Sequence, residues 1–316
     1  EYIHAMFGRE NVKSIFTVGE CWANDMDEIC RHIDYDRGEL STLFQFDHLR
    51  AGRKDKFTPG EKSLKTVRDT IVKWQLQMQD LGLLHALFTD NHDNAPFISR
   101  VVDDRALRYE GATCVATMFY LLRGVPFIYQ GQEIGITASA YDSMASYIEE
   151  RLTFYGEMLD DRIEEGLSEE EALQKVNFGS RDNARRPFAW DGSQYAGFST
   201  HAPWLPIASR AGEINLAADC KAEKSVARFY RDLLRLRREE PALRRGVTAV
   251  LSAEEDNFFV FTRTLDGRVF TVVCNFEQPS TIDGAKDFGK EVLHNYADRR
   301  DGDTAFRPYE IAVFEK

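Results

Sequence analysis

The sequence predicts an α/β fold in which parallel β/α units are followed by a small antiparallel β domain. Between residues 14 and 240, short runs of consecutive apolar residues alternate with stretches of helical periodicity. This alternation is typical of strands that are buried on both faces and connected by helices. From residue 242 onward, apolar and polar residues alternate between turn signals, which is typical of antiparallel strands. The sequence therefore places a domain boundary between residues 241 and 242.

Four apolar runs are the expected parallel strands. They are SIFTVGE at 14–20, LFQFDH at 43–48, LHALFTDNHD at 84–93 and VPFIYQGQE at 125–133. Each run ends in polar or acidic residues. In a parallel β/α barrel the carboxyl ends of the strands form the active-site face. We therefore expect these polar ends to gather at a single mouth.

Helical periodicity fills the intervals between these runs. A Pro-Gly start signal at 59–60 precedes five apolar residues at helical spacing, namely Leu64, Val67, Ile71, Trp74 and Met78. Residues 106–122 hold a second helical pattern, and Gly124 is expected to end it in the left-handed conformation.

The segment after the fourth run is less regular. Residues 141–165 predict an amphipathic helix, and Ser168 with Glu171 predicts a capping box that starts another. A Gly-, Trp- and Pro-rich loop follows over 178–207, and a loop of this length without periodicity is more often functional than idle. A last helix is expected before Pro241, with one apolar face formed by Val226, Phe229, Tyr230, Leu233 and Leu236.

The composition excludes several classes of function. Forty basic and 52 acidic residues give a formal charge of −12, which disfavours binding to nucleic acid. No run of 18 apolar residues and no secretory signal is present, so we expect neither a membrane span nor export. The five cysteines form no C-x-x-C pair, which indicates reduced thiols in a cytoplasmic protein and no metal site.

Glu20 closes the first run, in the sequence TVGECW. Partial burial beside Trp22 would favour the protonated form of its carboxyl group, which suits a general acid. The alternative is a strand-end carboxylate that caps the next helix, and for a single residue this is the more common situation.

His92 and Asp93 end the third run and are a second candidate. Neighbouring donors and acceptors of this kind can bind vicinal sugar hydroxyls, although a satisfied polar turn would look the same. Glycoside hydrolysis requires two carboxylates at one mouth, and Glu20 with Asp93 could supply them. The sequence alone does not separate this pair from the other carboxylates expected on the same face, Asp47, Asp90, Glu133 and Asp182.

The long loop adds Arg181 and Arg185, whose guanidinium groups could bind hydroxyls or a carboxylate. Alternatively, they pair with Asp182 or Asp191 and brace the loop. Three aromatic residues of the loop could stack on sugar rings or pin the loop to the core, namely Trp190, Phe198 and Trp204.

Taken together, four stretches resemble the α-amylase family of glycoside hydrolases (family 13). They are TVGECW, FTDNHDNAPFISR, GVPFIYQGQEIG and SRDNARRPFAWDGSQYAGFSTHAPWLPI, the last of which is similar to the branch of oligo-1,6-glucosidases, α-glucosidases and trehalose-6-phosphate hydrolases. The resemblance implies a retaining α-glucosidase on a (β/α)8 TIM barrel followed by a β-sandwich. Residues 1–241 would form the second half of the barrel, and residues 242–316 the sandwich.

The resemblance also implies a role for each candidate residue. Glu20 would be the general acid and base, Asp93 the carboxylate that stabilises the transition state, and His92 a hydrogen-bond partner of the same sugar. Arg181 or Arg185 would hold the glucose at the non-reducing end of a short oligosaccharide. The resemblance implies no cofactor, and any calcium loop of the family would lie upstream of this chain.

The family's aspartate nucleophile would also lie upstream, at the end of the fourth barrel strand. The resemblance therefore predicts that these 316 residues are nearly inactive alone, and that an N-terminal half or a second copy completes the barrel. Two alternatives stay open: a catalytically inactive binding or assembly protein of the same family, and a sucrose isomerase or transglucosylase.

Overall fold

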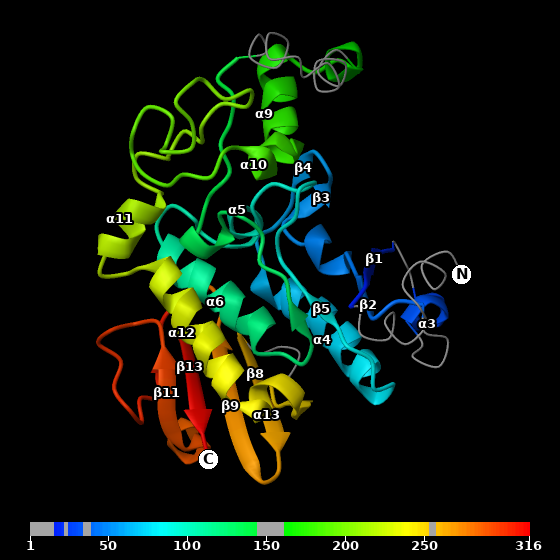
Figure 1. Ribbon diagram of the computed structural model, residues 1–316, viewed down its shortest axis with the longest axis vertical. Coiled ribbons are helices and arrows are strands. Elements are labelled where there is room, and N and C mark those ends of the chain that lie inside the picture. Colours follow the sequence, from blue (N-terminus) through cyan, green and yellow to red (C-terminus); the bar gives the residue numbers. More distant parts are fainter. Residues whose placement is uncertain (1–15, 22–24, 34–38, 144–160, 253–256) are drawn as a thin grey trace.

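The computed structural model describes residues 16–21, 25–33, 39–143, 161–252 and 257–316 of the chain. Four short strands form two hydrogen-bonded pairs, both parallel: β1 (Val18–Glu20) with β2 (Thr42–Phe44), and β5 (Ala86–Leu87) with β6 (Val125–Pro126). Helices pack beside these strands, and an antiparallel sheet lies at the opposite end of the molecule from α9 (Figure 1).

The two strand pairs run in the same direction. At the start of β2, the Thr42 hydroxyl donates to the backbone oxygen of Leu84, just before β5, at 2.6 Å. At the end of β2, the Phe44 ring contacts Phe88 and Phe127, which follow β5 and β6, with centroid distances of 4.9 and 4.7 Å. The carboxyl ends of all four strands therefore meet at one edge, as the sequence predicts.

Strand β1 differs from the prediction that every run is buried on both faces. Phe16 and Val18 are exposed. Among the described residues, β1 pairs only with β2, so its other edge and much of its surface face solvent.

The helices between the strands follow the predicted pattern, with corrections at their ends. Helix α4 (Leu64–Asp80) begins after Ser63, whose side chain accepts a hydrogen bond from Thr66 N. The expected start signal instead lies in a hairpin of β3 (Arg53–Asp55) and β4 (Thr58–Pro59). The 3-10 turn η1 (Asp47–Arg50) and the helices α3 (Met26–Ile33) and α5 (Phe97–Val101) were not predicted.

Gly124 does not end a helix. Helix α6 (Arg108–Tyr120) ends earlier, at Tyr120. Gly124 has a φ of 154°, and a Cβ atom there would lie 2.2 Å from the backbone oxygen of His85. Close approach of this turn to the chain before β5 therefore requires glycine, rather than a left-handed helix cap.

Beyond β6 the chain forms the 3-10 turn η2 (Gln132–Ile134), and most of the helix predicted at 141–165 lies outside the described residues. The predicted capping box is confirmed, because Ser168 and Glu171 exchange hydrogen bonds at the start of α9 (Glu169–Gly179). The predicted last helix is α12 (Val226–Glu239), and three short helices accompany it: α10 (Asp182–Arg185), α11 (Leu216–Lys221) and α13 (Pro241–Arg245).

The C-terminal region contains a five-stranded antiparallel sheet in the order β11-β13-β9-β8-β7. Its strands are β7 (Val247–Val250), β8 (Phe258–Leu265), β9 (Arg268–Asn275), β11 (Lys290–His294) and β13 (Ile311–Glu315). Asp266 and Gly267, a turn signal in the sequence, join β8 to β9 with φ values of 50° and 82°. Such a pair matches the right-handed twist of a hairpin.

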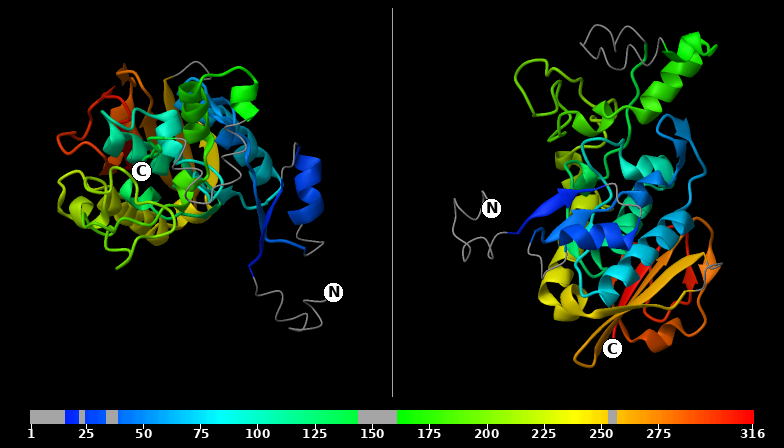
Figure 2. Two further views of the ribbon diagram at one scale, coloured as in Figure 1. Left: turned by 90° about the horizontal axis from the view of Figure 1, so that it is seen from above. Right: turned by 90° about the vertical axis from the view of Figure 1, so that its right-hand side faces the viewer.

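Both faces of this sheet are covered. On one face Phe259, Phe261 and Val272 share a continuous apolar core with helices α4, α6 and α12, which lie over the sheet in Figure 2. On the other face Phe306 and Phe288 pack against Phe314 and its neighbours. These two residues belong to the short ribbon of β10 (Ser280–Thr281) with β12 (Ala305–Phe306) and to the 3-10 turn η3 (Ala285–Phe288).

Two buried arginines join the sheet to the helices. Arg263 on β8 donates to the backbone oxygens of Leu121 and Leu243, at 2.5 and 2.8 Å. Arg237 on α12 donates to Leu243 and to Gly124, at 2.9 and 2.6 Å. Burial lowers the pKa of Arg263 to about 9 and that of Arg237 to about 10. Both guanidinium groups thus satisfy carbonyl oxygens near the end of α6 that would otherwise lack partners.

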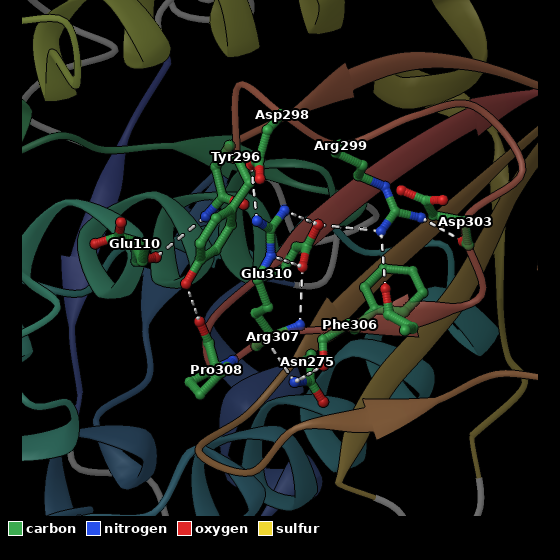
Figure 3. Close-up of polar contacts among 12 residues, drawn as sticks. Glu110, Asn275, Tyr296, Asp298, Arg299, Asp303, Phe306, Arg307, Pro308 and Glu310 are labelled. Carbon is green, nitrogen blue, oxygen red and sulfur yellow. Dashed lines mark hydrogen bonds and ion pairs between the residues drawn. The ribbon is translucent and has the colours of Figure 1, made fainter.

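A buried ionic cluster fixes the chain between β11 and β13 (Figure 3). Glu310, 1 % exposed, accepts from Arg299 Nη1 at 3.1 Å and from Arg307 Nε at 2.9 Å. Arg299 also pairs with Glu291 at 2.8 Å, and Arg307 with Asp298 at 2.7 Å. The loop from 295 to 310 is therefore held to the sheet by buried charges, Arg299 with Glu291 and Glu310, and by the more exposed pair of Arg307 with Asp298.

Within the described ranges, no helix combines the length and apolar character needed to span a bilayer.

Candidate active site at the carboxyl ends of the strands

A cavity of about 210 Å³ opens where the four parallel strands end. Its lining includes Glu20 from the end of β1, Asp90 and His92 after β5, and Tyr129 after β6. Phe44, Phe88 and Phe127 form its apolar floor. The predicted gathering of polar strand ends at one mouth is therefore observed.

Glu20 is exposed, so the partial burial expected of it is not found. The reason is the position of β1, which has a hydrogen-bonded neighbour on one side only among the described residues. Trp22, the expected aromatic neighbour, lies outside the described residues.

Asp93 lies at the centre of a charged group contributed by two separate segments. Its Oδ1 atom accepts from Arg185 Nη2 at 2.9 Å and lies 3.7 Å from Arg181 Nη1. Its Oδ2 atom lies 3.1 Å from His92 Nε2. Arg185 Nε also donates to the backbone oxygen of His92, at 2.8 Å. The long loop and the turn after β5 are thus joined at the residues singled out in the sequence.

These contacts distinguish the two arginines that the sequence left equivalent. Arg185 holds both the carboxylate and the backbone of the turn at 92–93, whereas Arg181 lies further from Asp93. Asp191 does not brace Arg185, because its Oδ1 atom instead accepts from the Ser193 backbone and hydroxyl. We therefore regard Arg185 as the residue that orients Asp93.

The remaining carboxylates of this face are hydrogen-bonded within the protein or partly to fully buried. Asp90 accepts from the Thr89 hydroxyl at 2.7 Å and from Phe97 N at 2.8 Å. Burial raises the pKa of Asp90 and also that of Glu133. Asp47 accepts from Trp74 Nε1 at 3.0 Å, and Asp182 is buried. Glu20 and Asp93 are more accessible to a ligand than these four.

A buried polar network supports the turn that follows β5. Gln132 Nε2 donates to the Thr89 hydroxyl at 2.7 Å, to Tyr120 at 2.6 Å and to Tyr230 at 3.1 Å. Thr89 in turn donates to Asp90. Helices α6 and α12 and the turn at η2 therefore fix the position of Asp90, two residues before His92.

Two histidines lie inside the strand layer, and burial lowers the pKa of His48 to about 3 and that of His85 to about 4. Both side chains are therefore neutral at pH 7. The loop aromatics Trp190, Phe198 and Trp204 are exposed rather than pinned to the core.

Comparisons with known proteins agree with this geometry. Residues 1–246 match the family model of the α-amylase catalytic domain. The chain belongs to the α-amylase family. Members of this family among the solved structures share its fold, so the parallel strands and their helices are the second half of a TIM barrel, followed by the antiparallel sheet.

Among curated α-amylase family relatives, an oligo-1,6-glucosidase of Heyndrickxia coagulans is 34% identical over 306 residues, covering 94% of this chain and 54% of its own length. A trehalose-6-phosphate hydrolase of Bacillus subtilis (strain 168) is 30% identical and covers 99% of this chain and 57% of its own length. The chain thus spans about half the length of the curated relatives it matches.

The similar solved structures also include enzymes of different names. The trehalose-6-phosphate hydrolase of Bacillus licheniformis superposes with a TM-score of 0.87 at 27% identity, covering 99% of this chain and 59% of its own. A trehalulose synthase superposes with a TM-score of 0.83 at 31% identity, covering 99% of this chain and 59% of its own.

Two features of the site were not predicted from the sequence. One is the Gln132 network, because Thr89, Gln132 and the two tyrosines are far apart in the chain. The other is the hairpin of β3 and β4, which brings a run of basic residues close to Asp93. The sequence GRKDK at 52–56 was the available signal, and it was not interpreted.

Proposed function

We propose that this chain forms half of the active site of a retaining α-glucosidase, which acts at the non-reducing end of short oligosaccharides. The observation that carries the proposal is the single mouth shared by Glu20 and His92, with Asp93 held directly beside it by Arg185. Membership of the α-amylase family supports it, as do relatives named oligo-1,6-glucosidase.

In this proposal Glu20 donates a proton to the glycosidic oxygen while the bond from that oxygen to C1 breaks. A carboxylate nucleophile bonds to C1, and we propose that residues other than the 316 printed here supply it. In the second step Glu20 takes a proton from water, which attacks C1 and releases the carboxylate. Asp93 faces the positive charge that develops on the sugar ring in both steps.

The accessible position of Glu20 suits this double role, because the second step brings water to the same carboxylate. Asp93 needs a fixed orientation instead, and its contacts with Arg185 and His92 provide one. The arginines also have donors in reach of a sugar hydroxyl beside Asp93, which supports binding of the terminal glucose.

The structural similarity to a trehalulose synthase favours one second candidate, in which a sugar hydroxyl replaces water as the acceptor. Product analysis separates the two. Free glucose as the main product supports the α-glucosidase, whereas an isomerised disaccharide from sucrose supports the transfer reaction.

The function is tested in the full-length protein that contains these residues. We expect it to release glucose from isomaltose, and we expect Asp93→Asn to lower kcat/KM by about 10²–10³, because the charge facing the transition state is lost. Asp191→Asn is the control, since this partly exposed carboxylate bonds only within its own turn among the described contacts. Absence of glucose release from the unmodified protein would favour the inactive binding or assembly alternative.

We also propose that an N-terminal half or a second copy packs against the open edge of β1. The exposed apolar side chains of Phe16 and Val18 support a partner at this edge. A well-behaved monomer of the isolated 316 residues in sedimentation analysis would count against it. A cytoplasmic location, expected from the cysteines, is part of the same proposal.

A further inference from the structure

Arg53, the first residue of β3, lies at one end of a chain of hydrogen bonds that reaches Asp93. We propose that Arg53 is a positioning residue for Asp93 and acts through two asparagines of the turn after β5. Arg53 Nη1 donates to Asn94 Oδ1 at 3.0 Å, and Asn94 Nδ2 donates to Asn91 Oδ1 at 2.9 Å. The same Asn91 oxygen accepts from the backbone N–H of Asp93, at 3.1 Å. This inference rests on the proposed function, because it concerns how the carboxylate of that site is held.

The chain of hydrogen bonds has a fixed direction, because its first member can only donate. A guanidinium group has no acceptor, so the oxygen of the Asn94 amide must face Arg53. The NH₂ group of that amide then points to Asn91 and donates to its oxygen. Without Arg53, the Asn94 amide could turn over and present its oxygen to that of Asn91. Arg53 therefore determines which atom of Asn94 supports the turn.

Arg53 and Arg185 act on different parts of Asp93. Arg185 binds the carboxylate, whereas the chain from Arg53 reaches the backbone N–H. The Asp93 side chain is 43 % exposed, so packing restrains it little and its orientation depends on hydrogen bonds. A carboxylate that must face a developing charge needs both its backbone and its side chain in place.

The base of the hairpin that carries Arg53 is itself fixed to α5. Arg100 of this helix is buried, and its Nη1 atom donates to the backbone oxygens of Leu49 and Ala51, at 2.7 and 3.2 Å. Gly52 has a φ of 74°, and a Cβ atom there would lie 2.1 Å from the backbone oxygen of Arg100. Only glycine allows this close approach. The backbone just before Arg53 is therefore held in place.

Arg53 differs from the two lysines of the same hairpin. Its side chain is partly buried, and desolvation lowers its pKa, with repulsion from Arg50 as a smaller cause. Lys54 and Lys56 are exposed. Among the hydrogen bonds of the described residues, the one from Arg53 joins the hairpin to the turn at 91–94, and none from the two lysines does. A lysine of the hairpin can therefore serve as a control for charge alone.

The test measures glucose release from isomaltose by the full-length protein that contains these residues. We expect Arg53→Met to lower kcat by about tenfold and to change KM by less than about twofold, because Asp93 acts in the transition state. Asn94→Ala should give a similar loss. The double variant should lose no more than either single variant, since both substitutions break the same chain.

The Asp93→Asn background separates positioning from direct action on the substrate. In that background, Arg53→Met should lower kcat by less than about twofold, because the carboxylate that it orients is already absent. A full tenfold loss there would overturn the inference, since Arg53 would then act without Asp93.

Lys54→Met is the matched control, because it removes the same charge from the next position. It should lower kcat by less than about threefold, since the exposed charge is screened by salt. Equal losses in Lys54→Met and Arg53→Met would overturn the inference, as would a loss in Arg53→Met that appears in KM alone. If the circular dichroism melt shows that Arg53→Met is unfolded, Asn94→Ala carries the same comparisons.

The unmodified protein distinguishes the two levels of the argument. If it hydrolyses isomaltose while any of the contrary results occurs, only the inference fails and the proposed function stands. If it releases no glucose, the proposed function fails and the inference fails with it.

Discussion

Replacing Glu20 by Gln in the full-length protein is expected to lower kcat/KM for isomaltose by about 10²–10⁴, because proton donation to the leaving sugar is lost. We expect this because Glu20 lies at the end of β1, on the wall of the cavity that His92 also lines. The variant should bind substrate with little change, since glutamine keeps the size of the side chain and hydrogen-bonding groups.

A leaving group that needs no proton distinguishes this role from a structural one. With p-nitrophenyl α-glucoside, the first step should proceed almost normally in Glu20→Gln, so a burst of nitrophenol should precede slow turnover. Glu223→Gln, which changes an exposed carboxylate just after the end of α11, is the matched control and should behave like the unmodified enzyme. Equal losses on isomaltose and on the aryl glucoside, without a burst, would argue against a general acid at this position.

Replacing Glu310 by Gln is expected to have the largest effect on stability. Its carboxylate is buried and pairs with Arg299 and Arg307, so the variant leaves two guanidinium groups without their common acid (Figure 3). Breaking a buried pair of this kind costs about 3–5 kcal/mol in the free energy of unfolding. Equilibrium urea denaturation of the 316-residue chain measures it, provided that the transition is reversible.

The exposed pair of Glu315 with Arg268 is the control for the same substitution. Because both side chains are partly in water, Glu315→Gln should cost less than about 1 kcal/mol. Similar losses in the two variants would show that burial does not set the strength of the Glu310 cluster.

The stability difference between the unmodified chain and Glu310→Gln should also depend on pH. Burial alone would raise the pKa of Glu310, but the hydrogen bonds from Arg307 and Arg299 outweigh it and hold the pKa below its usual value. The contribution is therefore complete above the unfolded-state pKa of about 4.3 and is lost as the pH falls through the lower folded-state value. The urea midpoints of the two proteins are measured at pH 7 and in acid, and the difference between them should be smaller in acid.

Much of the fold could be predicted because its signals are local. The parallel strands, the capping box at Ser168 and the turn at Asp266 each depend on a few neighbouring residues. The boundaries were less accurate where packing decides them. Gly124, for example, is required by the approach of His85, which is 39 positions away, and a helix-cap rule does not contain that contact.

The candidate site shows the same division. Strand ends placed Glu20 and His92 at one mouth with Asp93 beside it, since the direction of parallel strands fixes this. The choice of Arg185 over Arg181 required coordinates, because it depends on how α10 meets the turn after β5. The burial expected of Glu20 was wrong for a similar reason, since the exposure of a strand is set by its neighbours in the sheet.

The arginines that bind carbonyl oxygens between α6 and β8 have a consequence for how the molecule responds to truncation. Removing the polypeptide after residue 246 would take away Arg263 together with the apolar face of Phe259, Phe261 and Val272. The helices that pack on this sheet would then expose a large apolar surface and an uncapped helix terminus to water. The C-terminal region is therefore needed to cover the helices of the barrel half, and shortened versions should aggregate.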